Sequence, residues 1–261
     1  MNDIILCICN HLKDIDKLYL LSTKTDFHRL KVYTFFERKV FAWLVHKLFY
    51  YDNFQRIINN DNYEIPKYAK HITFTDHVSE SSLWPDSVKS LRLCSYVKVT
   101  GIIMLPPNIK RLSLCYDNHD INDFSLGHVE HITYHYSDRK YIEGLNIPAH
   151  ITSLKLYHHP ERHFKILIPP TVTRLCLDDW NGFGGYHKIV PDTVTHLKIY
   201  ASHWGLELCH IPDGVTHFLL VDDYNSVDEM TDAHLQNIPQ KLVEFVILDK
   251  KRNVFMNIRR N

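Results

Sequence analysis

Apolar residues recur along this chain as a pattern of three, repeated about every 21 residues. In each copy the first apolar residue, called the anchor or position 0, is followed by apolar residues at positions +3 and +5. The anchors are Ala69, Val88, Ile109, Val129, Ile151, Val172, Val194, Val215 and Leu242. Successive anchors are 19, 21, 20, 22, 21, 22, 21 and 27 residues apart. Regular recurrence at this spacing is typical of a repeat protein.

Positions +3 and +5 are apolar in all nine copies. Position +3 holds Ile72, Leu91, Leu112, Ile132, Leu154, Leu175, Leu197, Phe218 and Phe245. Position +5 holds Phe74, Leu93, Leu114, Tyr134, Leu156, Leu177, Ile199, Leu220 and Ile247. Positions +2, +4 and +6 are mostly polar, and this alternation with period two indicates a strand with one buried and one wet face.

Proline marks the start of almost every copy. Eight of the eleven prolines stand three residues before an anchor, and only the fourth copy, with Leu126, lacks one. They are Pro66, Pro85, Pro106, Pro148, Pro169, Pro191, Pro212 and Pro239. Proline fixes φ and donates no hydrogen bond, so it suits the beginning of a strand and not its middle. Each copy is therefore predicted to be a bend, a short strand and a return loop.

One such strand cannot bury its apolar face alone, but copies stacked edge to edge share a continuous core. The predicted fold is α/β, a leucine-rich-repeat-like solenoid with a parallel sheet of about nine strands, preceded by a small N-terminal helical segment. Residues 1–60 are predicted to form that segment and residues 61–261 the solenoid. The basic C-terminal tail is expected to cover or follow the last strand.

The spacing V/I-x-x-L-x-L resembles the strand core of leucine-rich repeats. It more closely resembles the FNIP repeat, in which Ile-Pro and a short spacer precede Val-Thr-His-Leu. Val194-Thr195-His196-Leu197 fits that motif, and Val215-Thr216-His217-Phe218 nearly does. The resemblance covers roughly residues 65–248, although the Phe-Asn pair that names the family is absent. FNIP repeats occur in slime moulds and in giant viruses of amoebae, which implies a repeat protein of that type.

The first sixty residues follow a different pattern. Ile4, Ile5, Ile8 and Leu12 recur at helical spacing. Asp14 or Asp16 is expected to cap a second helix that carries Leu18 and Leu21. A longer helix is predicted from Glu37 through Phe54. Its shared face would hold Val40, Trp43, Leu44, Lys47, Leu48 and Tyr51.

This segment resembles an F-box over about 35 residues. The resemblance rests on an Ile- and Leu-rich helix, the polar step Lys13-Asp14-Ile15-Asp16-Lys17-Leu18, then Leu21-Ser22-Thr23-Lys24 and Phe27. It implies docking onto a Skp1-like subunit of a cullin ubiquitin ligase. The residues implied in that contact are Ile4, Ile5, Ile8, Leu12, Ile15, Leu18 and Leu21. The alternative is a helical cap that only seals the first repeat, as solenoid ends require.

Composition limits the partners and the location. Lys and Arg number 30 and Asp and Glu number 30, so the formal net charge is zero. This balance argues against non-specific binding to nucleic acid or membrane surfaces. The longest apolar run, near Val40 to Tyr51, is too short to cross a bilayer, and the first residues lack a signal-peptide layout. The expected location is cytoplasmic in a host cell, or nuclear, and not secreted.

The sequence offers little catalytic chemistry. Among 19 histidines, His71, His131, His196 and His217 share position +2. Even the two on adjacent repeats are too few for a tight zinc site, so no metal and no cofactor are predicted. The chain has no glycine-rich phosphate loop, G-x-S-x-G, H-E-x-x-H or paired C-x-x-C motif. We therefore expect a protein that is not an enzyme.

A binding surface is the remaining prediction. Tyr, Trp and Arg dominate protein interfaces, and such residues occupy the outward strand positions and the strand ends. The candidates are Arg92, Arg111, Lys155, Tyr157, Arg174, Asp178, Trp180, His196, Lys198, Tyr200, Trp204, His217, Asp222 and Tyr224. The predicted function is a non-enzymatic substrate-recognition adaptor of a Skp1–cullin–F-box ubiquitin ligase. The alternatives are a stand-alone repeat scaffold binding a host or viral protein, or a nucleic-acid or ligand binder using the basic strand face.

Overall fold

The structure is a computed structural model of the whole chain. It describes residues 2–60, 63–79, 84–94, 97–115, 124–135, 147–157, 167–180, 190–201, 211–222, 239–249, 251 and 253–259. The chain divides into two compact units. The first comprises Met1–Leu112 with Asn118–His128, and the second comprises Ser113–Asp117 with Val129–Asn261.

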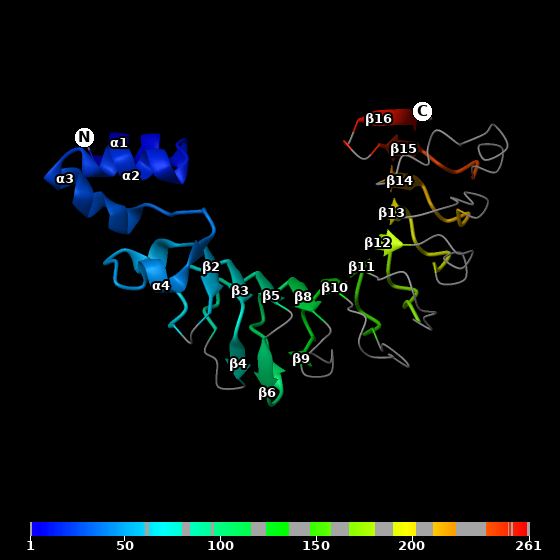
Figure 1. The fold of residues 1–261 in the computed structure, drawn as a ribbon, viewed down its shortest axis with the longest axis horizontal. Helices are drawn as coiled ribbons and strands as arrows, with labels where there is room; N and C mark the ends of the chain where they lie inside the picture. The colour runs from blue at the N-terminus through cyan, green and yellow to red at the C-terminus, as the bar shows by residue number, and fades with distance from the viewer. Residues whose placement is uncertain are drawn as a thin grey trace. The chain divides into compact units, whose positions relative to one another are not determined.

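All nine strands predicted from the repeats are present, and each begins two residues after its anchor. They are β3 (His71–Phe74), β5 (Ser90–Leu93), β8 (Arg111–Cys115), β10 (His131–His135), β11 (Ser153–Tyr157), β12 (Arg174–Trp180), β13 (His196–Ala201), β14 (His217–Asp222) and β15 (Glu244–Leu248). In the first unit β3 pairs in parallel with β5. In the second unit β10 through β15 pair in parallel in chain order. The chain is thus a leucine-rich-repeat-like solenoid (Figure 1).

The predicted core positions are all inside. Every anchor and every residue at +3 and +5 is buried, with exposure of at most 4%. Registers such as Leu154↔Leu175 and Leu156↔Leu177 place each apolar side chain beside its equivalent on the next strand. Burial is continuous because each strand covers the apolar side of its neighbour.

The prolines form turns rather than simple bends. In all eight copies the proline carbonyl accepts a hydrogen bond from the anchor N–H, as from Val172 to Pro169 at 3.1 Å and from Val194 to Pro191 at 3.0 Å. The apolar residue before the proline, as in Ile168 or Ile211, is also buried. A fixed φ at the first residue of this turn therefore sets where the next strand begins.

Threonine side chains connect successive strands. At position +1 the hydroxyl of each threonine donates to the main-chain carbonyl of the +1 residue one repeat earlier. These bonds run from Thr152 to Glu130, Thr173 to Thr152, Thr195 to Thr173 and Thr216 to Thr195, at 3.1–3.4 Å. At position −1, Thr171 donates in the same way to Ile151 and Thr193 to Val172. The Val-Thr motif thus has a structural role that the strand pattern alone did not indicate.

The N-terminal helices are α1 (Asn2–Asn10), α2 (Asp14–Ser22) and the short α3 (Thr25–His28), followed by the 3-10 helix η1 (Arg29–Tyr33). The predicted pair of helices is present, but the N-cap of α2 is Lys13, whose side chain makes no cap bond. Their small core consists of Cys9, Leu21, Phe27 and Leu30, with Ile5, Leu6 and Leu20 against it. The inward stripe of α1 therefore runs through Ile5 and Cys9, whereas Ile4 and Ile8 are exposed.

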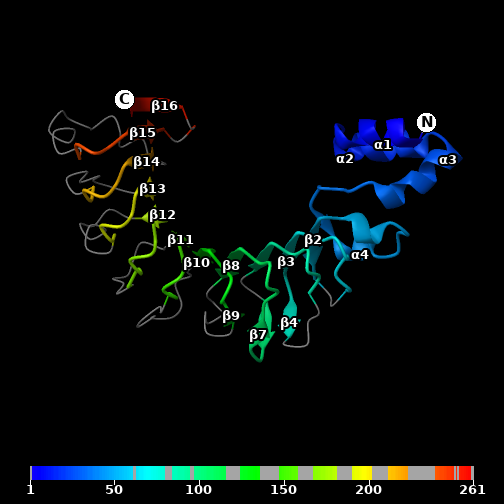
Figure 2. The ribbon, with the colours of Figure 1, turned by 180° about the vertical axis from the view of Figure 1, so that it is seen from behind.

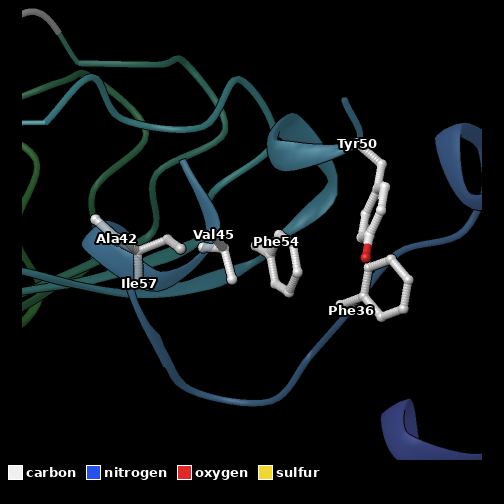
Figure 3. Packing of buried hydrophobic residues seen from close by; sticks show 6 residues of the cluster. All are labelled: Phe36, Ala42, Val45, Tyr50, Phe54 and Ile57. Carbon is white, nitrogen blue, oxygen red and sulfur yellow. The ribbon is translucent and has the colours of Figure 1, made fainter. Parts of the chain in front are cut away.

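The prediction of a long helix over Glu37–Phe54 is wrong. That stretch contains the strand β1 (Val40–Phe41), the single turn α4 (Ala42–Val45) and the 3-10 helix η2 (Tyr51–Asn53). The next strand, β2 (Arg56–Asn59), joins β1 to β3 in parallel. Ala42, Val45, Tyr50 and Phe54 are buried around Phe36 and Ile57 (Figure 3). Trp43 and Leu44 of the predicted inner face are exposed.

This region is in fact an additional repeat. Counted from Phe54 as anchor, position +3 is Ile57 and position +5 is Asn59, and all three residues are buried. The sheet therefore begins before residue 61. The polar Asn59 at +5 and the absence of the proline turn hid this copy in the sequence.

Additional short strands lie in the return segments of the first unit. β4 (His77–Ser79) pairs with β6 (Lys98–Thr100), and β7 (Ile103–Met104) pairs with β9 (Phe124–Ser125), both in parallel. Figures 1 and 2 show β4 and β9 on the side of the return loops, away from the main sheet of that unit. At the other end of the chain, β16 (Val254–Arg259) pairs antiparallel with β15, so the basic tail covers the last strand of the second unit as expected.

Candidate protein-interaction surface

The outward side of the second unit is arranged in rows, because equivalent positions of parallel strands lie side by side. Position +6 of β10, β11 and β12 holds His135, Tyr157 and Asp178, which are paired in register. Position +4 holds Lys155, Cys176 and Lys198 on β11, β12 and β13. Position +2 holds Arg174, His196 and His217 on β12, β13 and β14. The repeat therefore gathers candidates that are more than forty residues apart in the sequence.

Lys155 connects the +4 row to the +6 row. Its Nζ lies 2.8 Å from Asp178 Oδ2, 4.1 Å from the ring centroid of Tyr157 and 5.1 Å from that of Tyr200. Burial disfavours the charged ammonium, but hydrogen bonds with Asp178 and Tyr157 outweigh it and raise the pKa of Lys155. Its charge is therefore held in place and compensated.

Aromatic rings flank this ion pair. His135 stacks on Tyr157 with ring centroids 3.9 Å apart and planes 14° apart. Lys198 Nζ lies 4.6 Å from the ring of Tyr200 on the same strand. We call Lys155, Tyr157, Asp178, Lys198 and Tyr200 the aromatic–cation cluster. It presents flat rings and charges of both signs, the features of a protein interface.

Cys176 lies between Lys155 and Lys198 in the +4 row. Burial raises the pKa of its thiol to about 11, and Asp178 acts in the same direction, although both lysines oppose the shift. At neutral pH the thiol is protonated, so it is a poor nucleophile. Cys176 therefore acts as a small packing residue beneath the cluster.

His196 and His217 form a stacked pair in the +2 row, with centroids 4.3 Å apart and planes 1° apart. Each Nδ1 lies 2.9 Å from the hydroxyl oxygen of the preceding threonine. Because those threonine hydroxyls donate to main-chain carbonyls, each hydroxyl oxygen accepts from Nδ1–H. Burial, then His217 and Arg174, lower the pKa of His196. In the neutral form of His196, Nε2 therefore carries the lone pair.

The outward side becomes apolar toward the C-terminal strands. Leu219 and Val246 occupy position +4 of β14 and β15 and are half-buried, as is Leu248 at position +6. Val254 of β16 is exposed opposite Leu248. At this edge Arg259 Nη2 forms an ion pair with Glu244 Oε1 at 2.8 Å. The sequence pattern did not indicate these apolar residues, His135 or Cys176, but comparing equivalent positions across repeats would have found them.

The remaining predicted solenoid residues divide into two groups. Arg92 on β5 and Arg111 at the start of β8 are exposed and belong to the first unit. Trp180 and Asp222 end β12 and β14, but their side chains lie outside the described residues, as do Trp204 and Tyr224 altogether. For these four residues the predicted contacts remain predictions.

The predicted contact residues of the N-terminal helices differ in accessibility. Ile4, Ile8 and Ile15 are 65%, 43% and 44% exposed, and Tyr19 of α2 is also exposed. Ile5, Leu12 and Leu18 are half-buried. Leu21 is completely buried in the helical core, so its side chain is not available to a partner in this conformation.

The described residues contain no group of three or more His, Cys, Asp or Glu side chains placed to hold a metal ion. Within the same part of the chain, no helix has the length and apolar character needed to cross a membrane.

Comparison with known proteins adds one structural likeness. No family model matches the chain, and neither does any curated protein. Among solved structures the chain is similar to CroV588, a giant-virus protein described as a novel circular LRR structure, with 14% identity and a TM-score of 0.46. The likeness covers 82% of this chain and 32% of that one, so the chain spans about a third of its length. The FNIP and F-box resemblances therefore stay predictions.

Proposed function

We propose that this protein is a non-enzymatic interaction adaptor. Its N-terminal helices would dock a Skp1-like subunit of a cullin ubiquitin ligase, and its solenoid would hold the substrate protein. The observation that carries the first half is the exposure of Ile4, Ile8 and Ile15 on helices whose other side already forms a core. Exposed apolar side chains on folded helices are a feature of protein interfaces. The aromatic–cation cluster supports the second half.

The test uses accessible residues, because substituting a core residue would unfold the helices. We expect Ile4→Asp and Ile15→Asp, singly and together, to abolish co-purification with a Skp1-like protein without changing the thermal midpoint. Asn2→Asp is the matched control, since it adds the same charge at an exposed position of α1. Unchanged co-purification of the double variant, or no co-purification by the wild-type chain, would rule out the adaptor.

A second candidate, a stand-alone scaffold whose helices only cap the solenoid, is favoured by specific contacts in the first unit. Lys17 Nζ donates to the Phe35 carbonyl at 2.9 Å, and the Arg38 N–H donates to Asp14. Leu18 of α2 packs against the core of the first repeat. These contacts hold α2 against the first repeat of the solenoid. Binding of a host or viral protein by the solenoid, with no Skp1-like subunit bound, is the outcome that this candidate requires.

A further inference from the structure

Three large apolar side chains protrude where the sheet of the first unit begins. In the single turn α4, Ala42 and Val45 point into the core, so Trp43 and Leu44 between them point away from it and are 47% and 57% exposed. Phe41, the last residue of β1, is 41% exposed, and its ring centroid lies 6.3 Å from that of Trp43. We call Phe41, Trp43 and Leu44 the apolar turn.

The core of this repeat does not include the apolar turn. Its buried residues are Phe36, Ala42, Val45, Tyr50, Phe54 and Ile57 (Figure 3). On the outward side of the sheet, the register places the half-buried Ile58 of β2 beside Phe41. Single exposed apolar residues are ordinary on a protein surface, but three within four consecutive residues, with another apolar residue beside them, form a patch. Such a patch indicates a surface that contacts another molecule.

The residues flanking the apolar turn are basic. Residues 38–47 contain no Asp or Glu, and they contain three exposed cations, namely Arg38, Lys39 and Lys47. Two carboxylates lie close by. Glu37 directly precedes this stretch, and Asp14 accepts a hydrogen bond from the Arg38 N–H but is paired with Lys17. Residues 37–47 therefore carry three cations and one carboxylate next to the apolar side chains.

We propose that the apolar turn inserts into an anionic lipid surface, with the three flanking cations against the lipid headgroups. Trp, Phe and Leu are the side chains that enter the boundary between headgroups and acyl chains, and Lys and Arg beside them are attracted by anionic lipids. The zero net charge of the whole chain does not oppose this contact, because salt screens charges farther away than about 10 Å. The contact goes beyond the proposed adaptor function, which uses other side chains.

Two other kinds of partner fit this surface less well. Protein interfaces are depleted of Lys, whereas two of the three cations here are lysines. Binding of single-stranded nucleic acid depends on rings on which successive bases stack, and Leu44, the most exposed residue of the apolar turn, has no ring. A lipid surface uses both the aliphatic and the aromatic side chains.

The test uses the full chain and its sedimentation with sucrose-loaded vesicles. We expect binding to phosphatidylcholine vesicles that contain about 30% phosphatidylserine to be about tenfold tighter, or more, than binding to phosphatidylcholine alone, because each cation gains from the anionic surface. Raising the salt from about 50 to about 300 mM should weaken binding to the anionic vesicles. Absence of binding to the anionic vesicles would overturn the proposal, and so would equal binding to both kinds of vesicle.

Variants locate the contact. Leu44→Ser should weaken binding to the anionic vesicles about five- to tenfold, because it removes apolar area from the bilayer boundary. Lys39→Gln should weaken it about three- to fivefold through the lost charge. The matched controls are Ile102→Ser and Lys98→Gln, since both residues are exposed in the same unit, on β6 or just after it. Both controls should bind as the wild type does. If all four variants bind alike, the contact lies elsewhere and the proposal fails.

Tryptophan fluorescence reports insertion directly. Trp43 is one of four tryptophans, and lipids with brominated acyl chains quench an indole that enters the bilayer boundary. We expect quenching of the wild type by anionic vesicles of such lipids. Trp43→Phe should lose most of this quenching and still sediment with the vesicles, because it keeps an aromatic ring. Equal quenching of the two proteins would place a different part of the chain in the bilayer and overturn the proposal.

The lipid contact and the adaptor function fail separately. Vesicle binding without co-purification of a Skp1-like protein would reject the adaptor alone. Co-purification that is lost in Leu44→Ser, with no vesicle binding by the wild type, would assign the apolar turn to a protein partner and overturn the lipid contact alone.

Discussion

At the scale of single residues, a close backbone contact requires glycine at one position, whereas another glycine has no such contact. A Cβ placed on Gly214 would lie 1.9 Å from the carbonyl oxygen of Asp192 in the preceding repeat, whereas one on Gly127 would meet no atom within 4 Å. Backbone cannot move aside as a flexible side chain can. We expect Gly214→Ala to lower the free energy of unfolding by about 1–3 kcal/mol, and Gly127→Ala to change it by less than about 0.5 kcal/mol. Urea titration measures both, and equal values would contradict the close approach.

His71 makes stability depend on pH. Burial, then Arg56 and Arg111, lower its pKa in the folded protein below the ordinary value of 6.5, so the unfolded chain binds a proton more readily than the folded one. Its contribution is therefore absent well above pH 6.5 and becomes destabilising as the pH falls below that value. We expect the stability of the wild type to decrease relative to His71→Gln between about pH 7 and 5. Denaturant titrations of both proteins across that range measure the difference, and parallel curves would be the contrary result.

At the scale of the strand, the threonine row joins repeats and also orients the histidines. Thr195→Val removes the bond to the Thr173 carbonyl and the acceptor of His196 Nδ1–H, while Thr193→Val removes only the bond to the Val172 carbonyl. Each variant should lose about 1 kcal/mol of stability. Only Thr195→Val should shift the His196 tautomer toward Nε2–H, as read from its ring nitrogen chemical shifts. If Thr193→Val shifts it equally, the threonine does not set the tautomer.

The strands were predictable because the same physical requirement is repeated in nine copies. Leu175 and Leu177 must face inward for Leu197 and Ile199 to be covered, so the alternation persists and determines register as well as burial. The first repeat was not recognised in the sequence, because Asn59 occupies a core position and Val40, Leu44 and Leu48 are spaced as on a helix. The contacts between side chains were also not predictable. That Lys155 is paired depends on Asp178 one strand away, and only the register supplies that information.

At the scale of the whole molecule, each end of the sheet needs its own cover, since a solenoid has no neighbour to bury its terminal repeat. At the C-terminal end β16 provides the cover by pairing with β15. At the N-terminal end the cover consists of Phe36, which stacks on Phe54 with centroids 5.0 Å apart, and of Leu18 from α2. Asn53, buried beneath, donates its amide to the carbonyls of Lys31 and Val32.

Deleting residues 1–36 should therefore aggregate the protein rather than release a folded solenoid. The deletion exposes Tyr50, Phe54 and Ile57 to water, and it removes the two carbonyls that accept hydrogen bonds from the Asn53 amide. Size-exclusion chromatography and circular dichroism measure the outcome, with Lys17→Met as the milder control that keeps the chain intact but removes the bonds to Phe35 and Asp14. A monomeric deletion product with an unchanged β spectrum would mean that the helices are an independent module. Aggregation would mean that Skp1-like binding can be assigned only with the exposed isoleucine variants, because deletion would remove the binding site and the cap together.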